Sequence, residues 1–317
     1  MKQENITICF VTTIINIETI KKNIEAFKKN YPNFFFKFIV ICPKKDLIFF
    51  NDNLVNQAKI ISEESIIKLK NFRRIFLSYF NNKKKKFFTK RVNWYYQQCL
   101  KISFLFLNRA PLKVIWDADT LILKYIDFFD DKFLNSKNYE NLYELHTPYF
   151  VTNNIILKKM PNRFNSAINQ FTALTQNETT KLEITLEKFL KKKGNKQNWV
   201  SHIMAKGISI SNQMNDFSLF SEYELINIWK RNQTNFKFSY IRFYRTNKNY
   251  RLTENQVKLL KIFNYKHLTY EKHLLNSKKN NIKNNWIKFI IQLIFFEITM
   301  IKNFFKNIKK NKIIKNF

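Results

Sequence analysis

Glycine and proline are scarce in this 317-residue chain, which has two glycines and five prolines. Phosphate-binding loops of the P-loop and GxGxxG types need several glycines at short spacing. Gly194 and Gly207 cannot supply that spacing. The commonest nucleotide-binding fingerprints are therefore excluded.

Cysteines and long apolar runs are also few. Cys9, Cys42 and Cys99 stand far apart, so neither a zinc motif nor a disulfide framework is expected, and a reducing cytosol is favoured. No segment reaches the eighteen or so apolar residues of a spanning helix. The opening "MKQENITICFVTTII" has an apolar run without a cleavage region, which is more typical of a first strand than of a signal peptide.

Positive charge is abundant instead. The chain has 56 Lys and Arg against 23 Asp and Glu, a formal net charge of +33. The lysines stand among many Asn, Ile and Phe, a mixture that an AT-rich genome would encode, so part of the charge reflects codon usage. The remainder raises affinity for phosphates, sugar nucleotides and anionic membranes. With 45% hydrophobic and 17% aromatic residues, the chain is not disordered and can bury a core.

The first forty residues have the pattern of a βαβ unit. Residues 6–14 are rich in β-branched residues and predict a strand, and residues 36–42 predict a second. Between them, Ile17, Ile20, Ile24 and Phe27 recur at helical spacing before Pro32. A strand, a helix and a strand in this order predict parallel strands in an open α/β sheet.

The later segments are less regular. The lysine run 83–86 is typical of a loop, and residues 91–109 predict a helix that leads into a short strand over 114–116. Residues 130–250 mix loops and short elements. We predict a first domain over 1–250 and a basic helical region over 251–317.

The C-terminal region, from about residue 280, is almost entirely Lys, Asn, Ile and Phe. Its polar and apolar residues separate on a helical wheel, which is typical of a helix lying in a membrane interface. Glu297 falls on the apolar side and counts against that interpretation. A helix packed on the domain is the equal alternative.

Two aspartates, Asp117 and Asp119, directly follow the strand over 114–116 in "VIWDADT". Carboxylates this close repel one another and need a compensating positive charge. Mg²⁺ or Mn²⁺ would supply it, because both prefer oxygen ligands and often share them with substrate phosphates. The same pair could be an ordinary turn or helix cap. Its place at the carboxyl end of a strand favours a binding site.

The segment "WDADT" resembles the DxD motif of glycosyltransferases with the GT-A fold. "RVNWYYQQCLK", "VIWDADTLILKYIDFF", "HTPYF" and "FSEYE", in this order, resemble a bacterial glycosyltransferase family associated with surface polysaccharides. The resemblance covers roughly residues 5–250, and it departs at Asn93, where a small residue is usual. It implies a GT-A-like, Rossmann-type mixed sheet flanked by helices, with the basic helical tail added.

The resemblance also implies an activity. The expected enzyme is a metal-dependent glycosyltransferase that uses a nucleotide-diphosphate sugar as donor and a glycan or lipid-linked glycan of capsule or lipopolysaccharide as acceptor. Asp117 and Asp119 match its metal positions, with Mn²⁺ or Mg²⁺ as the ion, and Asp117 also matches a sugar-nucleotide position. The expected location is cytoplasmic, peripheral on the inner face of the membrane.

Further candidate residues surround this motif. On the helix over 91–109, aromatic, amide and cationic side chains could contact a nucleotide or its diphosphate, or could be core and solvated edge: Arg91, Trp94, Tyr95, Gln98 and Lys101. For the substrate, His146 and His202 could donate to a phosphate or coordinate the metal, although a lone histidine is more often a satisfied hydrogen-bond partner. Trp199 could stack on a sugar.

Glu222 and Glu224 are the candidate general bases for deprotonating an acceptor hydroxyl. In an extended segment they would share a side, and in a helix they would diverge by about 200°. A plain surface helix start is an equal interpretation.

Two other functions are compatible with the sequence. A nucleic-acid-binding protein would use the charge and the aromatics, but the lysines are spread along the chain and no helix-turn-helix, zinc or RNP pattern occurs. Nucleic acid is therefore not the expected partner. An inactive membrane-surface scaffold would keep the fold without activity, and the intact Asp117 and Asp119 argue against it.

Overall fold

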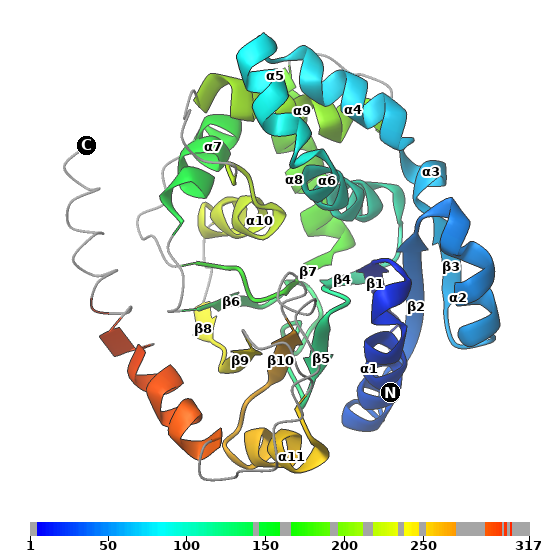
Figure 1. Cartoon of the computed structure of the whole chain (residues 1–317), viewed down its shortest axis with the longest axis vertical. Coiled ribbons are helices and arrows are strands. Elements are labelled where there is room, and N and C mark those ends of the chain that lie inside the picture. Colours follow the sequence, from blue (N-terminus) through cyan, green and yellow to red (C-terminus); the bar gives the residue numbers. More distant parts are fainter. Residues whose placement is uncertain are drawn as a thin grey trace.

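A mixed five-stranded sheet forms the centre of the protein in the computed structural model (Figure 1). The structure describes residues 5–141, 146–158, 166–190, 196–211, 218–233, 238–246, 252–270, 289–299, 301–302 and 305. The strand order is β3-β2-β1-β4-β7. The strands are β1 (Asn5–Val11), β2 (Phe35–Cys42), β3 (Lys59–Ser62), β4 (Leu112–Trp116) and β7 (Phe171–Thr175).

The sheet has a topological switch point between β1 and β4. Successive strands run outward from β1 through β2 to β3, after which the chain returns to place β4 on the other side of β1. These four strands are parallel, and only β7 pairs antiparallel, with β4. Ligands of open α/β sheets bind at the carboxyl ends of the strands beside such a point. Asp117 directly follows β4, so the fold places the acid pair there.

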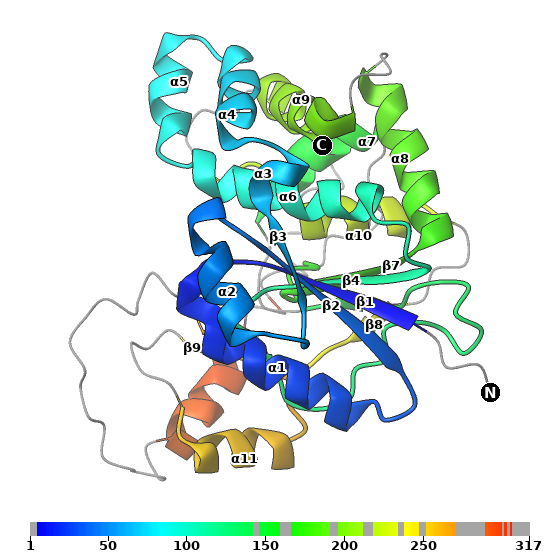
Figure 2. The ribbon, with the colours of Figure 1, turned by 90° about the vertical axis from the view of Figure 1, so that its right-hand side faces the viewer.

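Helices cover both faces of the sheet, as Figure 2 shows. One face carries α1 (Ile17–Asn30) and α2 (Leu47–Asn53), and Ile20, Ile24 and Phe27 of α1 are buried in its core cluster. The other face carries the remaining helices of the first 231 residues: α3 (Glu63–Ile66), α4 (Leu69–Ser78), α5 (Asn82–Thr89), α6 (Val92–Leu107), α7 (Thr147–Leu157), α8 (Gln176–Leu190), α9 (Lys196–Ser211) and α10 (Glu222–Arg231). The predicted mixed sheet flanked by helices is confirmed.

A smaller layer lies beyond the acid pair. Strands β5 (Thr120–Ile122), β10 (His267–Tyr270) and β9 (Phe243–Thr246) form a three-stranded sheet, and β6 (Asn138–Glu140) pairs with β8 (Phe238–Tyr240). The remaining elements are η1 (Ile14–Asn16), η2 (Lys44–Asp46) and α11 (Glu254–Ile262). Residues before and after the predicted boundary at 250 share the sheet of β9 and β10.

The βαβ prediction is confirmed by β1, α1 and β2, and so are the helix over 91–109 and the strand that precedes Asp117. The loop predicted for the lysine run is wrong, because residues 83–86 lie inside α5. The Asn81 side chain caps that helix by accepting from the Lys84 backbone N–H, and Phe88 anchors it in the core. The three cysteines are free and buried.

Helical residues 289–299 pack on the domain. Phe289 and Leu293 are buried in a cluster with Tyr244 and Tyr265, and Glu297 accepts hydrogen bonds from Tyr265 and Arg242. This explains the acidic residue on the apolar side. The helix still exposes a second apolar strip, with Ile294 53% and Phe295 64% accessible. Within the described ranges, no helix combines the length and apolarity that crossing a membrane requires.

Gly207 marks a close approach between α9 and α7. A Cβ atom at this position would lie 2.5 Å from Cγ1 and 2.6 Å from Cδ1 of Ile156. Ile156 is itself buried in the core. The contact between these two helices therefore depends on the absence of a side chain at 207.

Candidate functional site

Asp117 lies in a buried polar cluster with Lys101 of α6 and Glu222 and Tyr223 of α10. The Lys101 ammonium donates to Asp117 Oδ1 at 2.5 Å, to Glu222 Oε1 at 2.7 Å and to the Tyr223 hydroxyl at 3.2 Å. Tyr223 in turn donates to Asp117 Oδ1 at 2.6 Å. A residue after β4 is thus joined to two helices, α6 and α10, that lie far from each other in the sequence. The compensating charge that the sequence requires is a lysine of the chain itself.

Burial and ion pairing act together on this cluster. Burial disfavours the charged form of Lys101, but the neighbouring Asp117 and Glu222 outweigh it, so the Lys101 pKa is raised. Burial raises the pKa of Glu222, against the opposing effect of Lys101, and it also raises that of Tyr223. Lys101 therefore stays charged, and it holds two carboxyl groups in a setting of low polarity.

Gln170 reaches the other oxygen of Asp117, and Arg245 in turn reaches Gln170. With its amide oriented to satisfy both neighbours, Gln170 donates to Asp117 Oδ2 at 2.5 Å and accepts from Arg245 Nη2 at 2.5 Å. Gln170 immediately precedes β7, and Arg245 belongs to β9. Asp117 thus accepts hydrogen bonds from Lys101, Tyr223 and Gln170. A second cation, Arg245, contacts the other end of the Gln170 amide.

Asp117 as it lies does not suit a divalent metal ion. Both of its oxygens already accept hydrogen bonds, and the Lys101 ammonium would repel a cation beside it by roughly 8 kcal/mol, taking ~4 Å and an effective dielectric constant of ~20. Among the residues that the structure describes, no three His, Cys, Asp or Glu side chains form a metal-binding group. The second aspartate of the motif, Asp119, is half-buried.

Glu222 and Glu224 point in different directions because their segment is helical. Ser221 caps α10 by accepting from the Glu224 N–H, and Gln98 Oε1 accepts from the Glu222 N–H at 3.2 Å. Glu222 faces Lys101, whereas Glu224 accepts from Ser166 Oγ at 2.8 Å and the Ala167 N–H at 2.9 Å. Of the two candidate bases, only Glu222 lies with Asp117.

Glu224 gives the protein a pH-dependent stability. Burial raises its pKa from 4.5 to about 7, so the folded protein keeps a proton that the unfolded chain releases above 4.5. Stability should then fall as pH rises from about 4.5 to about 7. We expect Glu224→Gln, which keeps an oxygen acceptor and carries no charge, to be up to ~3 kcal/mol more stable than the parent at pH 8 and equal to it at pH 4.5. Urea denaturation at both pH values measures this difference.

The exposed Glu25 of α1 provides the control. Glu25→Gln should follow the parent protein at both pH values. An unchanged difference between Glu224→Gln and the parent across this range would contradict a buried, protonated Glu224.

A pocket opens beside Asp119. The backbone carbonyl of Asp119 accepts from the Tyr270 N–H at 3.0 Å, and Tyr270 lines the pocket. It holds about 800 Å³ of empty space, part of it open to solvent. Its wall carries three lysines against one acid, Glu254; they are Lys22, Lys258 and Lys261. The pocket therefore suits an anionic ligand.

Some of the residues predicted on α6 gather at a second place. The Arg91 guanidinium lies 5.6 Å from the centre of the Trp94 ring, and Trp94 stacks on Tyr149 with 6.5 Å between ring centres. His146 packs against the same Tyr149 at 4.2 Å, and its Nε2 donates to the Ser218 carbonyl at 2.7 Å. Arg91, Trp94 and His146 are thus brought together through Tyr149, while Gln98 and Lys101 turn inward to the Asp117 cluster.

Three predicted residues have structural surroundings instead. The buried Tyr95 hydroxyl accepts from the Leu219 N–H at 3.1 Å. Trp199 is 5% exposed and packs edge-on against Phe106, which leaves no open ring face for a sugar. His202 Nδ1 is 2.9 Å from the Tyr79 hydroxyl, and burial lowers its pKa. Trp199 is thus a core residue, and His202 is a satisfied hydrogen-bond partner.

Tyr223, Gln170 and Arg245 were missed by sequence reasoning. Each contacts the cluster from a segment more than fifty residues away from Asp117. Tyr223 lies between the two candidate glutamates and could have been included with them. For Gln170 and Arg245 no local pattern gave a signal.

Comparisons with known proteins give no family assignment. No family model matches the chain, and no curated protein matches it. Among solved structures, the galactosyltransferase LgtC, with donor and acceptor sugar analogues, is similar at 10% identity and a TM-score of 0.36, over 90% of this chain and 94% of that one. Mouse xyloside xylosyltransferase 1 is similar at 9% identity and a TM-score of 0.43, over 84% and 97%.

The Streptococcus pneumoniae glycosyltransferase GlyE is similar at 10% identity and a TM-score of 0.37, over 94% of this chain and 64% of that one. These three neighbours are glycosyltransferases. At these identities and TM-scores they assign no activity to this chain.

Proposed function

We propose that the protein is a glycosyltransferase that takes a sugar from a nucleotide-diphosphate donor. The observation that carries the proposal is the joining of Asp117, Lys101 and Glu222 at the switch point, with a lysine-lined pocket beside Asp119. In this arrangement the donor diphosphate lies in the pocket among Lys22, Lys258 and Lys261. The glycosyl unit of the donor then extends from the pocket past Asp119 toward Asp117 and Glu222.

The chain's own groups supply the chemistry of this proposal. Positive side chains stabilise the charge that develops on the departing diphosphate. Lys101 fixes Asp117, which orients the turn carrying Asp119. Glu222 is the proposed general base. The predicted Mn²⁺ or Mg²⁺ would have Asp119 as its protein ligand, because Asp117 is held by Lys101.

The donor site is tested by binding. We expect a nucleoside diphosphate to raise the melting temperature of the protein, since a ligand at a hundred times its Kd adds about 2.7 kcal/mol of stability. Lys258→Glu/Lys261→Glu should abolish the shift because it reverses the charge of the pocket wall. Lys44→Glu/Lys45→Glu, which makes the same charge change before α2, should keep it. No shift with any of the common nucleoside diphosphates, with or without Mn²⁺, would contradict the proposal.

The acceptor is proposed to be a surface glycan of capsule or lipopolysaccharide, carried on a lipid, with the enzyme peripheral on the inner face of the membrane. Two observations support a membrane location: the net charge of +33 and the exposed apolar strip of helical residues 289–299. An apolar strip beside basic residues is typical of interfacial binding.

Ile294→Glu/Phe295→Glu should lower binding to vesicles containing anionic lipid by at least about tenfold, measured by co-sedimentation. The matched change at another exposed apolar pair, Ile48→Glu/Phe49→Glu of α2, should leave binding within about twofold. Equal losses in the two variants would show that net charge alone holds the protein on the vesicle.

A further inference from the structure

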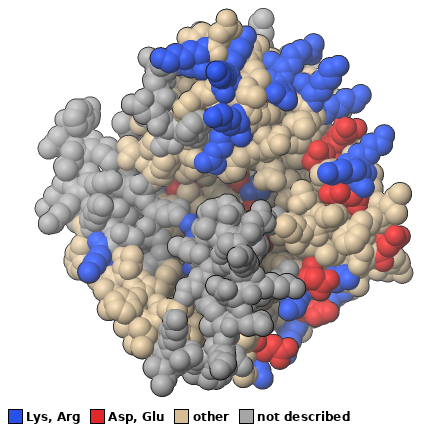
Figure 3. Space-filling model, in the orientation of Figure 1, with Lys and Arg blue, Asp and Glu red and all other residues tan. Residues whose placement is uncertain are grey.

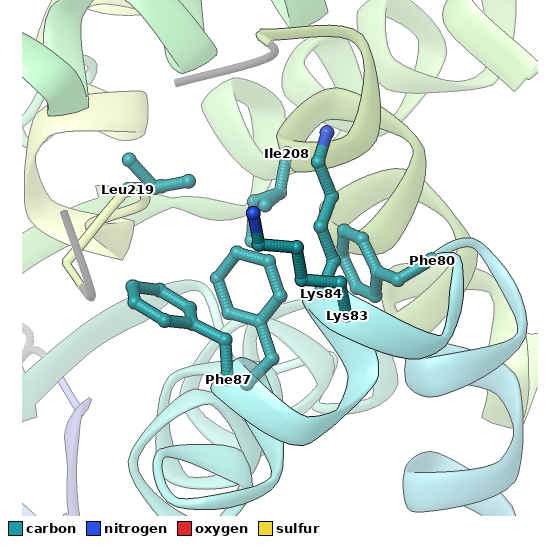
Figure 4. Close-up of a pocket in the computed structure, with 7 residues that line it drawn as sticks. Phe80, Lys83, Lys84, Phe87, Ile208 and Leu219 are labelled. Carbon is teal, nitrogen blue, oxygen red and sulfur yellow. The ribbon is translucent and has the colours of Figure 1, made fainter. Parts of the chain in front are cut away.

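A second pocket lies between α5 and α9, away from the sheet (Figure 4). It holds about 440 Å³ of empty space, part of it open to solvent. Its apolar wall comes from three separate segments: Phe80, Phe87 and Phe88 around α5, Ile208 of α9, and Leu219 before α10. Among the described residues, Lys83 and Lys84 complete the lining. The pocket is an apolar cavity with cations on one side.

The stretch of sequence that carries α4 and α5 has charge of one sign. No acidic residue occurs in the sequence between Glu64 and Asp117, although lysines and arginines recur throughout that stretch. Arg73 and Arg74 of α4 and Lys83 and Lys86 of α5 are exposed. Figure 3 shows basic side chains gathered over the end of the molecule that carries α4 and α5. A ligand here must tolerate or seek a strongly positive surface.

We propose that this pocket binds a lipid phosphate, with the apolar chain among the phenylalanines and the phosphate against Lys83 and Lys84. A sugar or a free nucleotide would leave the phenylalanine wall without a matching surface, and an uncharged lipid would not match the positive charge of the exposed Arg73, Arg74, Lys83 and Lys86. A lipid phosphate satisfies both. Burial of the lipid's hydrocarbon chain supplies affinity in proportion to its apolar area. The lysine ammonium groups select the phosphate end of the lipid.

The pocket is connected to the Asp117 cluster by a short segment. Leu219 lines the pocket, and its N–H is held by Tyr95; three residues later, Glu222 pairs with Lys101. A lipid phosphate bound here is therefore placed near the proposed transfer site. The use of this lipid as the carrier of the acceptor rests on the proposed function, whereas the binding itself does not.

The experiment is calorimetric titration of the full chain with farnesyl phosphate at concentrations where it stays monomeric. We expect saturable binding with one site, and binding at least tenfold weaker for inorganic phosphate and for farnesol. Lys83→Gln/Lys84→Gln should weaken binding at least tenfold, and Phe87→Ser should do the same. Their controls, Lys68→Gln/Lys70→Gln and Phe49→Ser on exposed surfaces elsewhere, should change it less than twofold.

Two results would overturn the proposal. Equal weakening by the two lysine pairs would mean that only the general positive field attracts the ligand. Binding of inorganic phosphate as tightly as farnesyl phosphate would mean that the apolar wall contributes nothing. The lysine pairs keep the test decisive if Phe87→Ser does not fold. Because no donor is present in the titration, its outcome is separate from that of the nucleotide-binding test.

Discussion

Replacing Lys101 with methionine should lower the free energy of unfolding by about 3–5 kcal/mol, because removing one partner leaves buried charges unpaired. Among the described residues, Lys101 is the cation that pairs with both Asp117 and Glu222, at 2.5 and 2.7 Å. Methionine keeps much of the side-chain length, so lost packing adds little. Urea denaturation at pH 7 measures the change.

The control for this prediction is Lys21→Met. Lys21 is 3.8 Å from Glu18 on the surface of α1, where an ion pair contributes at most about 1 kcal/mol. A double variant, Lys101→Met/Glu222→Gln, should recover part of the lost stability. Glu222→Gln removes one of the two carboxylates that Lys101→Met leaves unpaired. A loss of less than about 1 kcal/mol for Lys101→Met would show that the cluster is hydrated and not buried.

Replacing Asp119 with asparagine should lower transfer or donor hydrolysis at least about a hundredfold, because its carboxylate would hold the Mn²⁺ or Mg²⁺ that neutralises the departing diphosphate. Asp119 follows Asp117 of the buried cluster by two residues, and its backbone carbonyl accepts from Tyr270, which lines the lysine-lined pocket. The substitution keeps the shape of the side chain. Release of nucleoside diphosphate from a panel of nucleotide sugars, with Mn²⁺ and with a chelator, measures the effect.

Asp52→Asn, an isosteric change at an exposed position of α2, should leave turnover within about twofold. The melting temperature of Asp119→Asn should stay within a few degrees of the parent, so that lost activity is not lost folding. Turnover by Asp119→Asn equal to that of the parent would remove this aspartate from the proposed site. Equal turnover with and without chelator would show that the reaction does not depend on a divalent metal ion.

The elements that sequence patterns predicted correctly are those whose signals are local. The strand before Asp117 and the helix at Ile17–Asn30 follow from β-branched runs and from helical spacing of apolar residues. The loop predicted for the lysine run 83–86 was wrong because the charge of the run was given more weight than two other residues. Asn81 caps the helix and Phe88 anchors it in the core. Those two signals were present in the sequence.

The partners of Asp117 could not be predicted in the same way. Its contacts to Lys101, Tyr223 and Gln170 join segments that only the folded sheet brings together. The sequence indicated that a positive charge must accompany the two aspartates, but it could not distinguish a metal ion from a lysine. Likewise, the periodicity of the C-terminal region could not show which apolar strip would pack on the domain, since Phe289 and Ile294 are equally apolar.

The contact of Gly207 with Ile156 sets a limit on how far this chain can be re-coded or randomised. A methyl group there would overlap Ile156 by more than flexible packing absorbs, and the displaced helix, α7, begins directly after His146. Mutagenesis libraries that vary the lysine-rich surface should therefore keep position 207 fixed. If position 207 is varied, clones that are inactive because α7 and α9 cannot pack would be mistaken for clones that have lost a binding residue.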